Sequence, residues 1–138
     1  MRLLVTGGAG FIGSNLVREL ITQGHAVVVL DNLQSGYRSN LEALPVDAFL
    51  EADVRDQQAV LDAARGADGI FHLAASVGNK RSIDLPFDDA QTNVLGTLSV
   101  LEAARRCSIR KAAISAPRAT RRATSSRSSS SRCWRANR

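Results

Sequence analysis

The fold is decided by a stretch near the start of the chain, RLLVTGGAGFIG (residues 2–13). Its first part, Arg2–Thr6, is an apolar run that favours a buried β-strand. The run ends abruptly in glycines, which indicate a tight turn. The apolar residues that follow, between Phe11 and Gln23, recur at helical spacing, and Gly24 marks the end of this helix. Its buried stripe is predicted to hold Ile12, Leu16, Val17, Leu20 and Ile21.

The pattern continues outward from this unit as an alternation of strands and helices. Apolar runs predict strands at 26–30, 46–52, 69–74 and 111–115. Helical periodicity predicts helices at 57–65, with Asp56 as N-cap, and at about 88–106, with Val94, Leu98, Leu101 and Ala104 on one side. Loops are expected at 32–45, with at most a short helix near 41–44, and from 75 through Pro86. This alternation predicts an α/β fold with a doubly wound parallel sheet.

The charge of the chain is unevenly distributed. The net charge is +5, yet residues 1–115 hold 11 Lys or Arg against 13 Asp or Glu, whereas residues 116–138 hold seven Arg and no acidic residue. The second segment also contains no Leu, Ile, Val, Phe or Met, so it cannot bury enough apolar surface to offset its ordering entropy. We therefore predict one domain over 1–115 and a basic tail over 116–138 that is disordered or translated out of frame.

Several classes of protein are not expected from this composition. No apolar run approaches the roughly 18 residues that span a bilayer, and Met1-Arg2 leads directly into the first strand without the organisation of a signal peptide. A cytoplasmic location is therefore expected. Cys107 and Cys133 lie 26 positions apart and match no zinc spacing, so neither a metal site nor a disulfide framework is predicted.

The glycine turn has the spacing G-x-x-G-x-x-G, from Gly7 through Gly10 to Gly13, between a strand and a helix. A pyrophosphate at such a turn requires close approach of the backbone, which side chains would block. It also requires free N–H groups and the positive end of a helix dipole. Gly13, one turn inside the helix, would let helix and strand pack closely. The turn is therefore a candidate phosphate-binding loop.

An acidic residue supports this interpretation. Asp31 ends the second predicted strand, 18 residues beyond Gly13, where a carboxylate can accept hydrogen bonds from an adenosine ribose. Its negative charge would repel a 2′-phosphate, which favours NAD over NADP as the cofactor. The alternative is that the glycines only shape a tight turn and that Asp31 caps a loop.

Five segments of the chain resemble, in order and spacing, the extended short-chain dehydrogenase/reductase family. They are MRLLVTGGAGFIGSNLVREL at 1–20, VVLDNL at 28–33, ADVRD at 52–56, FHLAA at 71–75 and NVLGTLSVLEAAR at 93–105. Within this family they are most similar to the NAD-dependent nucleotide-sugar epimerases and dehydratases. The resemblance covers residues 1 to about 111 and implies a Rossmann fold. It is specific for the family and not for the substrate.

The resemblance implies a role for each matching residue on the diphosphate and ribose side of the cofactor. The residues that would surround the pyrophosphate are Gly7, Gly10, Phe11, Ile12 and Gly13. The residues that would hold the adenosine ribose are Asp31, Asn32 and the loop that extends to Gly36.

Further matching residues are implied at the two bases of the cofactor. Asp53 and Val54 match a pair that contacts adenine, and Asn93 matches an asparagine near the nicotinamide ribose. The residues that would run past the nicotinamide are Leu73, Ala74 and Ala75. The residues themselves leave alternatives open, because Asp53 can also be a loop or N-cap residue and Asn93 can satisfy buried backbone groups. His72 lies in an apolar strand and is interpreted as a packed core residue and not as a base.

The chemistry of the family resides in a Tyr-x-x-x-Lys pair on a further helix, assisted by a Ser or Thr after the fifth strand. The single tyrosine here is Tyr37, with Leu41 four positions later, so this pair is missing and no catalytic residue is predicted. Ser115 is a candidate for the family serine. The later strands of the sheet and the substrate domain are also missing from the sequence, so the sheet is expected to be incomplete.

Together these features favour the NAD-binding portion of a nucleotide-sugar epimerase or dehydratase, inactive by itself. One alternative is a non-enzymatic NAD-binding module whose basic tail contacts nucleic acid or acidic surfaces. Another is a reductase of the same fold. For intact relatives the resemblance implies a nucleotide-sugar substrate and a homodimer. Neither a membrane nor a nucleic acid is expected as a partner in the favoured interpretation.

Overall fold

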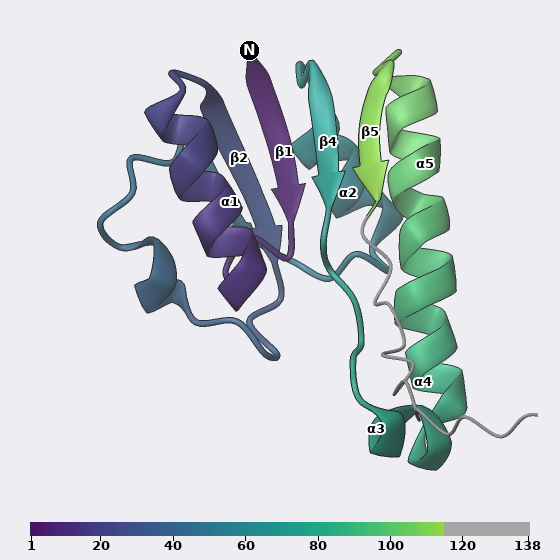
Figure 1. Cartoon of the computed structure of the whole chain (residues 1–138). Coiled ribbons are helices and arrows are strands. Elements are labelled where there is room, and N and C mark those ends of the chain that lie inside the picture. The colour runs from purple at the N-terminus through teal and green to yellow at the C-terminus, as the bar shows by residue number, and fades with distance from the viewer. Residues whose placement is uncertain (115–138) are drawn as a thin grey trace, which may run out of the picture.

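The computed structural model describes residues 1–114, and these form one five-stranded sheet with helices around it (Figure 1). Every pair of neighbouring strands is parallel, in the order β3-β2-β1-β4-β5. The strands are β1 (Arg2–Thr6), β2 (Ala26–Asp31), β3 (Ala48–Glu51), β4 (Gly69–His72) and β5 (Lys111–Ile114). The α-helices are α1 (Phe11–Thr22), α2 (Gln57–Ala64), α3 (Asn79–Asp84), α4 (Pro86–Ala90) and α5 (Gly96–Arg106). The predicted α/β fold with a parallel sheet is confirmed, whereas the predicted tail, 116–138, and Ser115 lie outside the described residues.

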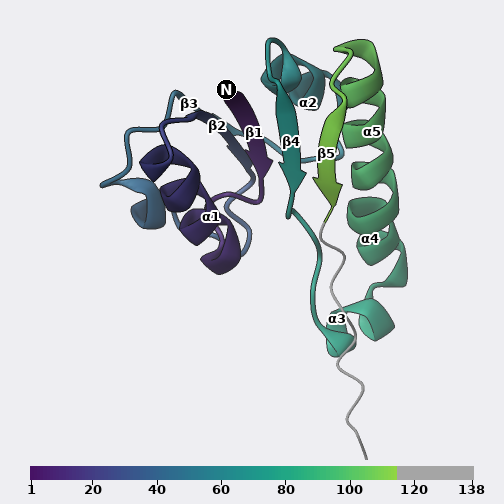
Figure 2. The same cartoon turned by 45° about the horizontal axis from the view of Figure 1, so that its top comes forward.

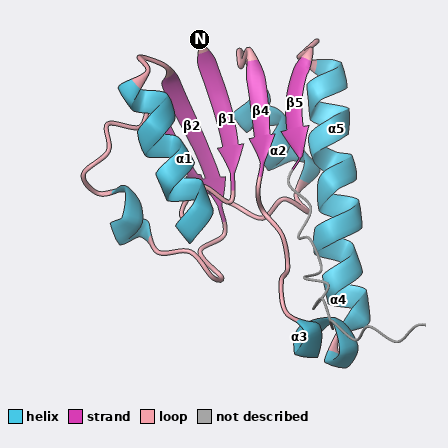
Figure 3. Cartoon of the chain, in the orientation of Figure 1, coloured by secondary structure: helices cyan, strands magenta, loops and turns pink. Residues whose placement is uncertain are grey.

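Helices cover both faces of the sheet, and each face has its own apolar cluster (Figure 3). Alternate residues of a strand point to opposite faces. Leu3 and Val5 of β1 therefore pack with Val17 of α1, whereas Leu4 packs with Val60 of α2 and with α5. None of the helices within residues 1–114 is long and apolar enough to cross a membrane.

The central strands are buried on both faces, as parallel strands between two layers of helices must be. In β2 the four residues from Val27 to Leu30 are fully buried, which explains their continuous apolar sequence. Because β1 pairs with β2 on one side and with β4 on the other, the loops after these three strands emerge at the same edge of the sheet. Figure 2 shows β3 beside β2 at the outer edge.

The predicted start of α2 is confirmed by its cap. The Asp56 carboxylate accepts hydrogen bonds from the backbone N–H groups of Gln58 at 3.0 Å and Ala59 at 3.1 Å. These are two of the N–H groups that a helix start leaves without an intrahelical partner. Gly66 follows the helix with φ of +70°, a backbone conformation that favours glycine.

The segment between β4 and α5 differs most from prediction. The expected loop that runs through Pro86 contains helix α3, and the helix expected from residue 88 begins at Pro86 and passes through a π-helical turn, Gln91–Leu95, before α5. Proline suits the first turn of a helix because that position needs no N–H donor. Helix α3 was missed because its sequence, NKRSID, carries no apolar periodicity.

Other boundaries moved by a few residues. The short helix expected near 41–44 is a 3₁₀ turn at Arg38–Leu41, the strand expected at 46–52 is limited to β3, and the strand expected at 69–74 ends at His72. The residues after His72 leave the sheet and line a cleft at its edge.

One prediction of burial was wrong, and most of the apolar side predicted for the last helix is exposed. The exposed fractions of Val94, Leu98 and Leu101 are 55%, 54% and 43%, although Ala104, expected on the same side, is buried. The buried side of α5 instead carries small residues such as Gly96 and Ser99. A Cβ on Gly96 would lie 2.7 Å from a methyl carbon of Val54, so small residues let α5 approach closely. Ile12, expected in the buried stripe of α1, is 69% exposed because it lies at the open end of that helix.

Candidate functional site

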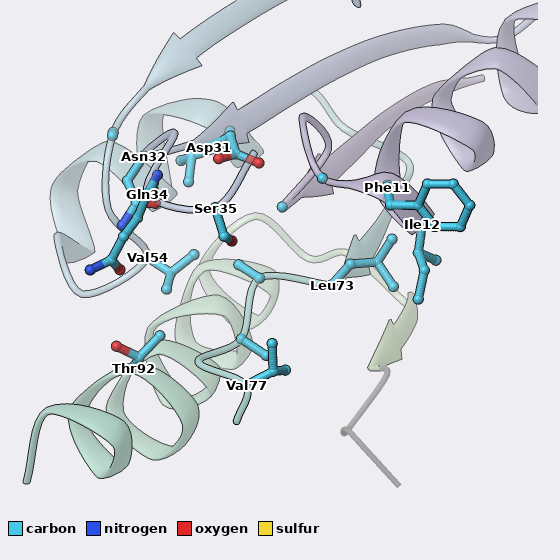
Figure 4. A pocket seen from close by; sticks show the side chains of 17 residues that line it. Phe11, Ile12, Asp31, Asn32, Gln34, Ser35, Val54, Leu73, Val77 and Thr92 are labelled. Carbon is cyan, nitrogen blue, oxygen red and sulfur yellow. Dashed lines mark hydrogen bonds between the residues drawn. The ribbon is translucent and has the colours of Figure 1, made fainter. Parts of the chain in front are cut away.

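A cleft of about 350 Å³ opens at the carboxyl-terminal edge of the sheet (Figure 4). Its walls come from the segments that follow β1, β2, β3 and β4, and from the π-helical turn before α5. The chain changes direction across the sheet at β1, with β2 on one side and β4 on the other, and open α/β sheets bind ligands at such a point. The lining residues are Gly7, Gly10, Phe11, Ile12, Gly13, Leu30, Asp31, Asn32, Gln34, Ser35, Ala52, Val54, Leu73, Ala74, Ala75, Val77 and Thr92.

Two of the glycines are required by the local geometry. Gly7 has φ of +71°, and a Cβ there would lie 2.6 Å from the backbone nitrogen of Ala74. A Cβ on Gly13 would collide with the carbonyl oxygen of Gly7. The first glycine thus lets the turn approach the β4 side of the cleft, and the third lets α1 pack against the turn.

The N-terminus of α1 faces the cleft without a side-chain cap. Its N-cap residue is Gly10, which makes no side-chain hydrogen bond, and its first turn holds no acidic residue. This differs from α2, where Asp56 occupies the same place with a carboxylate. Phe11 and Ile12, in the first turn of α1, line the cleft. The cleft therefore meets the positive end of a helix dipole that no carboxylate of the helix neutralises.

Asp31 holds the glycine turn and the next loop together. Its carboxylate accepts a hydrogen bond from the backbone N–H of Ala9 at 2.9 Å and another from the backbone N–H of Leu33 at 2.8 Å. Only 7% of the residue is exposed, yet it lines the cleft. Asp31 thus caps the loop that follows it, which is the alternative interpretation of this residue. The same carboxylate also lies beside the cleft.

Asn32, Asp53 and Arg55 form a polar cluster at the far end of the cleft. Arg55 donates to both carboxylate oxygens of Asp53, at 2.9 and 2.8 Å, and the Asn32 side chain donates to Asp53 at 2.9 Å. The hydrogen bonds from Arg55 are the main reason why the pKa of Asp53 is lowered to about 2. Asp53 does not line the cleft, whereas its neighbour Val54 does. The carboxylate of Asp53 thus already has three side-chain hydrogen bonds.

The opposite side of the cleft is formed by the chain after β4. Leu73, Ala74 and Ala75 line the cleft, whereas Asn93 does not. The Asn93 side chain accepts from the backbone N–H of Ser76 at 2.8 Å and donates to the carbonyl of Ser76 at 3.0 Å. Asn93 therefore satisfies backbone groups, which was the alternative left open for it.

His72 is a buried core residue, as predicted, with an exposed fraction of 3%. Its Nδ1 lies 2.7 Å from the Thr6 hydroxyl and its Nε2 lies 3.2 Å from the Thr97 hydroxyl. Burial lowers the pKa of the imidazole, because transfer from water disfavours the charged form.

Most of the predicted site residues line one cleft, and three do not. Gly36, Asp53 and Asn93 are adjacent to it without lining it. A Cβ on Gly36 would lie 2.8 Å from the backbone of Ala9, so this residue packs against the glycine turn. The lining residues that were not singled out are Leu30, Gln34, Ser35, Ala52, Val77 and Thr92. Gln34 and Ser35 belong to the loop expected at the ribose, whereas Thr92 comes from the unpredicted π-helical turn.

Comparison with known proteins agrees with this geometry. A family model described as the NAD dependent epimerase/dehydratase family matches residues 3–119. A UDP-glucose 4-epimerase of Mycolicibacterium smegmatis is 48% identical over 115 residues, which are 80% of this chain and 37% of the relative.

Solved structures give the same result. The UDP-glucose 4-epimerase of Thermus thermophilus, in complex with NAD, is similar with a TM-score of 0.76 and 43% identity, over 81% of this chain and 36% of that one. A dTDP-glucose 4,6-dehydratase of Streptomyces venezuelae with NAD and TYD bound has a TM-score of 0.75 and 40% identity, over 81% of this chain and 38% of that one. This chain thus spans less than two fifths of the length of these relatives. It belongs to the NAD dependent epimerase/dehydratase family.

Proposed function

We propose that the cleft binds NAD and that this chain is the NAD-binding portion of a nucleotide-sugar epimerase or dehydratase. One observation carries the proposal. The uncapped N-terminus of α1 and the buried carboxylate of Asp31 face the same cleft at the edge of the sheet. A dinucleotide is a ligand that needs both features, because it presents a diphosphate and a ribose diol side by side.

The glycine turn suits a diphosphate for steric and electrostatic reasons. Gly7, Gly10 and Gly13 bring no side chain into the cleft, and the first-turn N–H groups of α1 point toward it without a competing carboxylate. Phe11 and Ile12 lie at its mouth and would cover the diphosphate from water. In this proposal the backbone N–H groups of residues 11–13 supply the hydrogen bonds to the phosphate oxygens.

Asp31 suits a ribose with a free 2′-hydroxyl. Its two oxygens each accept one backbone hydrogen bond, and a carboxylate has further lone pairs for the hydroxyl groups of a ribose. A 2′-phosphate would bring negative charge against a buried carboxylate, so NAD is favoured over NADP. Asn32 and the loop to Gly36 would enclose the same ribose.

The two ends of the cleft suit the two bases of the cofactor. Val54 would lie against the adenine, with Asp53 in reach of the adenine amine once Asn32 or Arg55 releases one of its oxygens. Leu73–Ala75 would face the nicotinamide, where small side chains leave room for the cofactor, and Asn93 would hold this segment in place through Ser76. When bound, NAD accepts and returns a hydride, which is the chemistry that the cofactor itself supplies.

Turnover is not expected from this chain alone. Its single tyrosine, Tyr37, lies in the loop after β2 and is followed four positions later by Leu41, so the Tyr-x-x-x-Lys pair implied by the resemblance is missing from it. We therefore expect NAD binding without conversion of UDP-glucose. The nucleotide sugars named for the relatives are the proposed substrate class of the corresponding whole protein.

Isothermal titration calorimetry tests the proposal. The chain is titrated with NAD and with NADP, next to the variants D31A and D62A. We expect saturable binding of NAD, weaker binding of NADP, and a loss of about tenfold or more in NAD affinity for D31A. D62A is the matched control, because Asp62 is an exposed carboxylate on α2 that pairs with Arg65. A folded wild-type chain that binds no NAD at about millimolar concentration would contradict the proposal.

A further inference from the structure

A line of buried and partly buried hydrogen bonds runs through His72 from the cleft to the helix layer. The His72 ring lies between two hydroxyl groups, that of Thr6 on β1 and that of Thr97 on α5. The Thr6 oxygen also lies 3.4 Å from the backbone nitrogen of Ala74, and the Thr97 hydroxyl lies 2.7 Å from the carbonyl of Asn93. The line thus begins at a lining residue of the cleft and ends in the π-helical turn Gln91–Leu95.

The carbonyl of Asn93, at the end of this line, sets the direction of every hydrogen bond in it. A carbonyl oxygen only accepts, so the Thr97 hydroxyl donates to Asn93 and its oxygen accepts from Nε2–H of His72. The ring nitrogen Nδ1 then carries a lone pair and accepts from the Thr6 hydroxyl. The Thr6 oxygen in turn accepts from Ala74 N–H. His72 is therefore neutral and protonated at Nε2.

Both ends of this line hold the same short segment. Ala74 is held through Thr6, and Ser76 is held on both sides of its backbone by the Asn93 side chain. Together with the peptide from residue 74 to 76, these hydrogen bonds close a ring. We call it the hydrogen-bond ring, and its members are Ala74, Thr6, His72, Thr97, Asn93 and Ser76.

The segment held by the hydrogen-bond ring is the one that meets the glycine turn. The nitrogen of Ala74 would be 2.6 Å from a Cβ on Gly7, and Ala74 and Ala75 line the cleft. A shift of this segment would change the width of the cleft between the glycine turn and the β4 side. We propose that His72 is a positioning residue that fixes this side of the cleft for the nicotinamide half of the cofactor, an inference that rests on the proposed function.

Protonation of His72 would disturb this hydrogen-bond ring. An imidazole protonated at both nitrogens donates from Nδ1, so the Thr6 oxygen would have to accept from it as well as from Ala74 N–H, and the hydroxyl hydrogen of Thr6 would lose its acceptor. Among residues 1–114, the groups that face the imidazole bring no compensating charge. Its neighbours in the sheet are Thr6 on β1 and Ile114 on β5, and Thr97 reaches it from α5. Burial lowers the pKa of His72, which agrees with an imidazole that stays neutral near pH 7.

The tautomer can be measured without any ligand. Long-range ¹H–¹⁵N correlation spectra of the full chain, labelled with ¹⁵N-histidine, distinguish the two neutral tautomers and the imidazolium. The variant H25N removes the only other histidine and so assigns the signals. We expect the Nε2–H pattern for His72 at neutral pH. An Nδ1–H pattern or an imidazolium would overturn the inference.

The effect on binding is tested with two variants at Thr97 and two ligands. T97V keeps the shape of the side chain and removes its hydroxyl, whereas T97S keeps the hydroxyl. ADP serves as the second ligand because it lacks the nicotinamide half. We expect T97V to weaken NAD binding about fivefold, T97S to restore it to within about twofold of wild type, and ADP affinity to change by less than about twofold in both.

The outcomes separate this inference from the proposed function. Equal losses of NAD and ADP affinity in T97V would indicate a merely structural role for the hydrogen-bond ring and would overturn the inference. Unchanged NAD affinity in T97V would overturn it as well, while the proposed function stands. A folded wild-type chain that binds neither ligand would overturn the proposed function, and with it the binding half of the inference, even where the Nε2–H tautomer is observed.

Discussion

The side-chain amide of Asn40 donates a hydrogen bond to the backbone carbonyl of Ala9 at 2.8 Å. The same carbonyl accepts from the backbone N–H of Tyr37 at 3.1 Å, and the N–H of Ala9 donates to Asp31. Ala9, in the middle of the glycine turn, is therefore held by the last residue of β2 and by the segment 37–40 that follows this strand. The shape of the turn depends on residues more than 20 positions further along the chain.

Replacement of Asn40 by alanine should loosen the glycine turn. The Ala9 carbonyl would keep only the hydrogen bond from Tyr37, so we expect a loss of about 1 kcal/mol in the free energy of unfolding. NAD affinity should fall by about threefold to tenfold, because a less ordered turn loses more entropy on binding. Urea unfolding and calorimetry measure the two effects. Q23A, which removes an exposed hydrogen bond to Glu19 at the other end of α1, should leave NAD affinity unchanged, and an equal loss in Q23A would contradict this account.

Substitution of Asp31 by asparagine tests charge without changing shape. An asparagine side chain offers one oxygen to the two N–H donors of Ala9 and Leu33, and its amide group would face the other donor. We expect a loss of about 1–3 kcal/mol in unfolding free energy. We also expect the preference for NAD over NADP to shrink, because the repelling charge is gone. The ratio of the two dissociation constants checks this, and an unchanged ratio would show that Asp31 does not set the preference.

Two glycines of the turn should respond differently to alanine. In G13A the new methyl group would collide with the carbonyl of Gly7, so we expect a loss of about 3 kcal/mol or more in stability. In G10A the nearest atom to the new Cβ is the Gly7 oxygen at 3.3 Å, so the loss should be about 1 kcal/mol or less. G10A should nevertheless bind NAD about tenfold more weakly or worse, because its methyl group projects where a diphosphate needs the bare backbone. Thermal melts and titrations separate the two effects, and a G10A variant with wild-type affinity would argue against a diphosphate at this turn.

Acidification should destabilise the fold through His72. Its pKa is lowered in the folded chain from the ordinary value of 6.5, so the unfolded chain binds the proton first as the pH falls. The free energy of unfolding should therefore be highest above pH 6.5 and decline below it, until the folded form is also protonated. Unfolding curves between about pH 7.5 and pH 5.5 measure the decline. H72N should show a smaller decline over this range, and a wild-type chain that gains stability on acidification would contradict the burial of a neutral ring.

The sequence predicts the parts of the site that depend on local pattern. A strand, a glycine turn and a helix in direct succession place Gly7–Gly13 at the edge of the sheet, and a strand that ends in Asp31 places a carboxylate beside it. Asp56 as the cap of α2 also follows from residues within one turn of the helix. The glycine turn and the cap of α2 depend on residues that are close in the sequence, and Asp31 is found because it directly ends a strand, although it accepts from Ala9 N–H 22 positions earlier.

The parts that the sequence does not predict depend on contacts between distant segments. The hydrogen bonds from Asn40 to Ala9 and from His72 to Thr97 join residues 31 and 25 positions apart, and no periodicity encodes them. The π-helical turn changes which residues of the last helix face the cleft, so Thr92 lines it while Asn93 turns toward Ser76. The exposure of the apolar side of α5 is not predicted, because apolar spacing alone does not reveal that small residues make the close approach to α2.

Leu98 and Leu101 of α5, both about half exposed, affect how this chain must be handled at the bench. Apolar surface in contact with water promotes self-association as the protein concentration rises. It also binds reporter dyes such as anilinonaphthalene sulfonate, even when the protein is fully native. Dye fluorescence is therefore a poor indicator of misfolding here. Dilute samples and light scattering at several concentrations belong beside every titration.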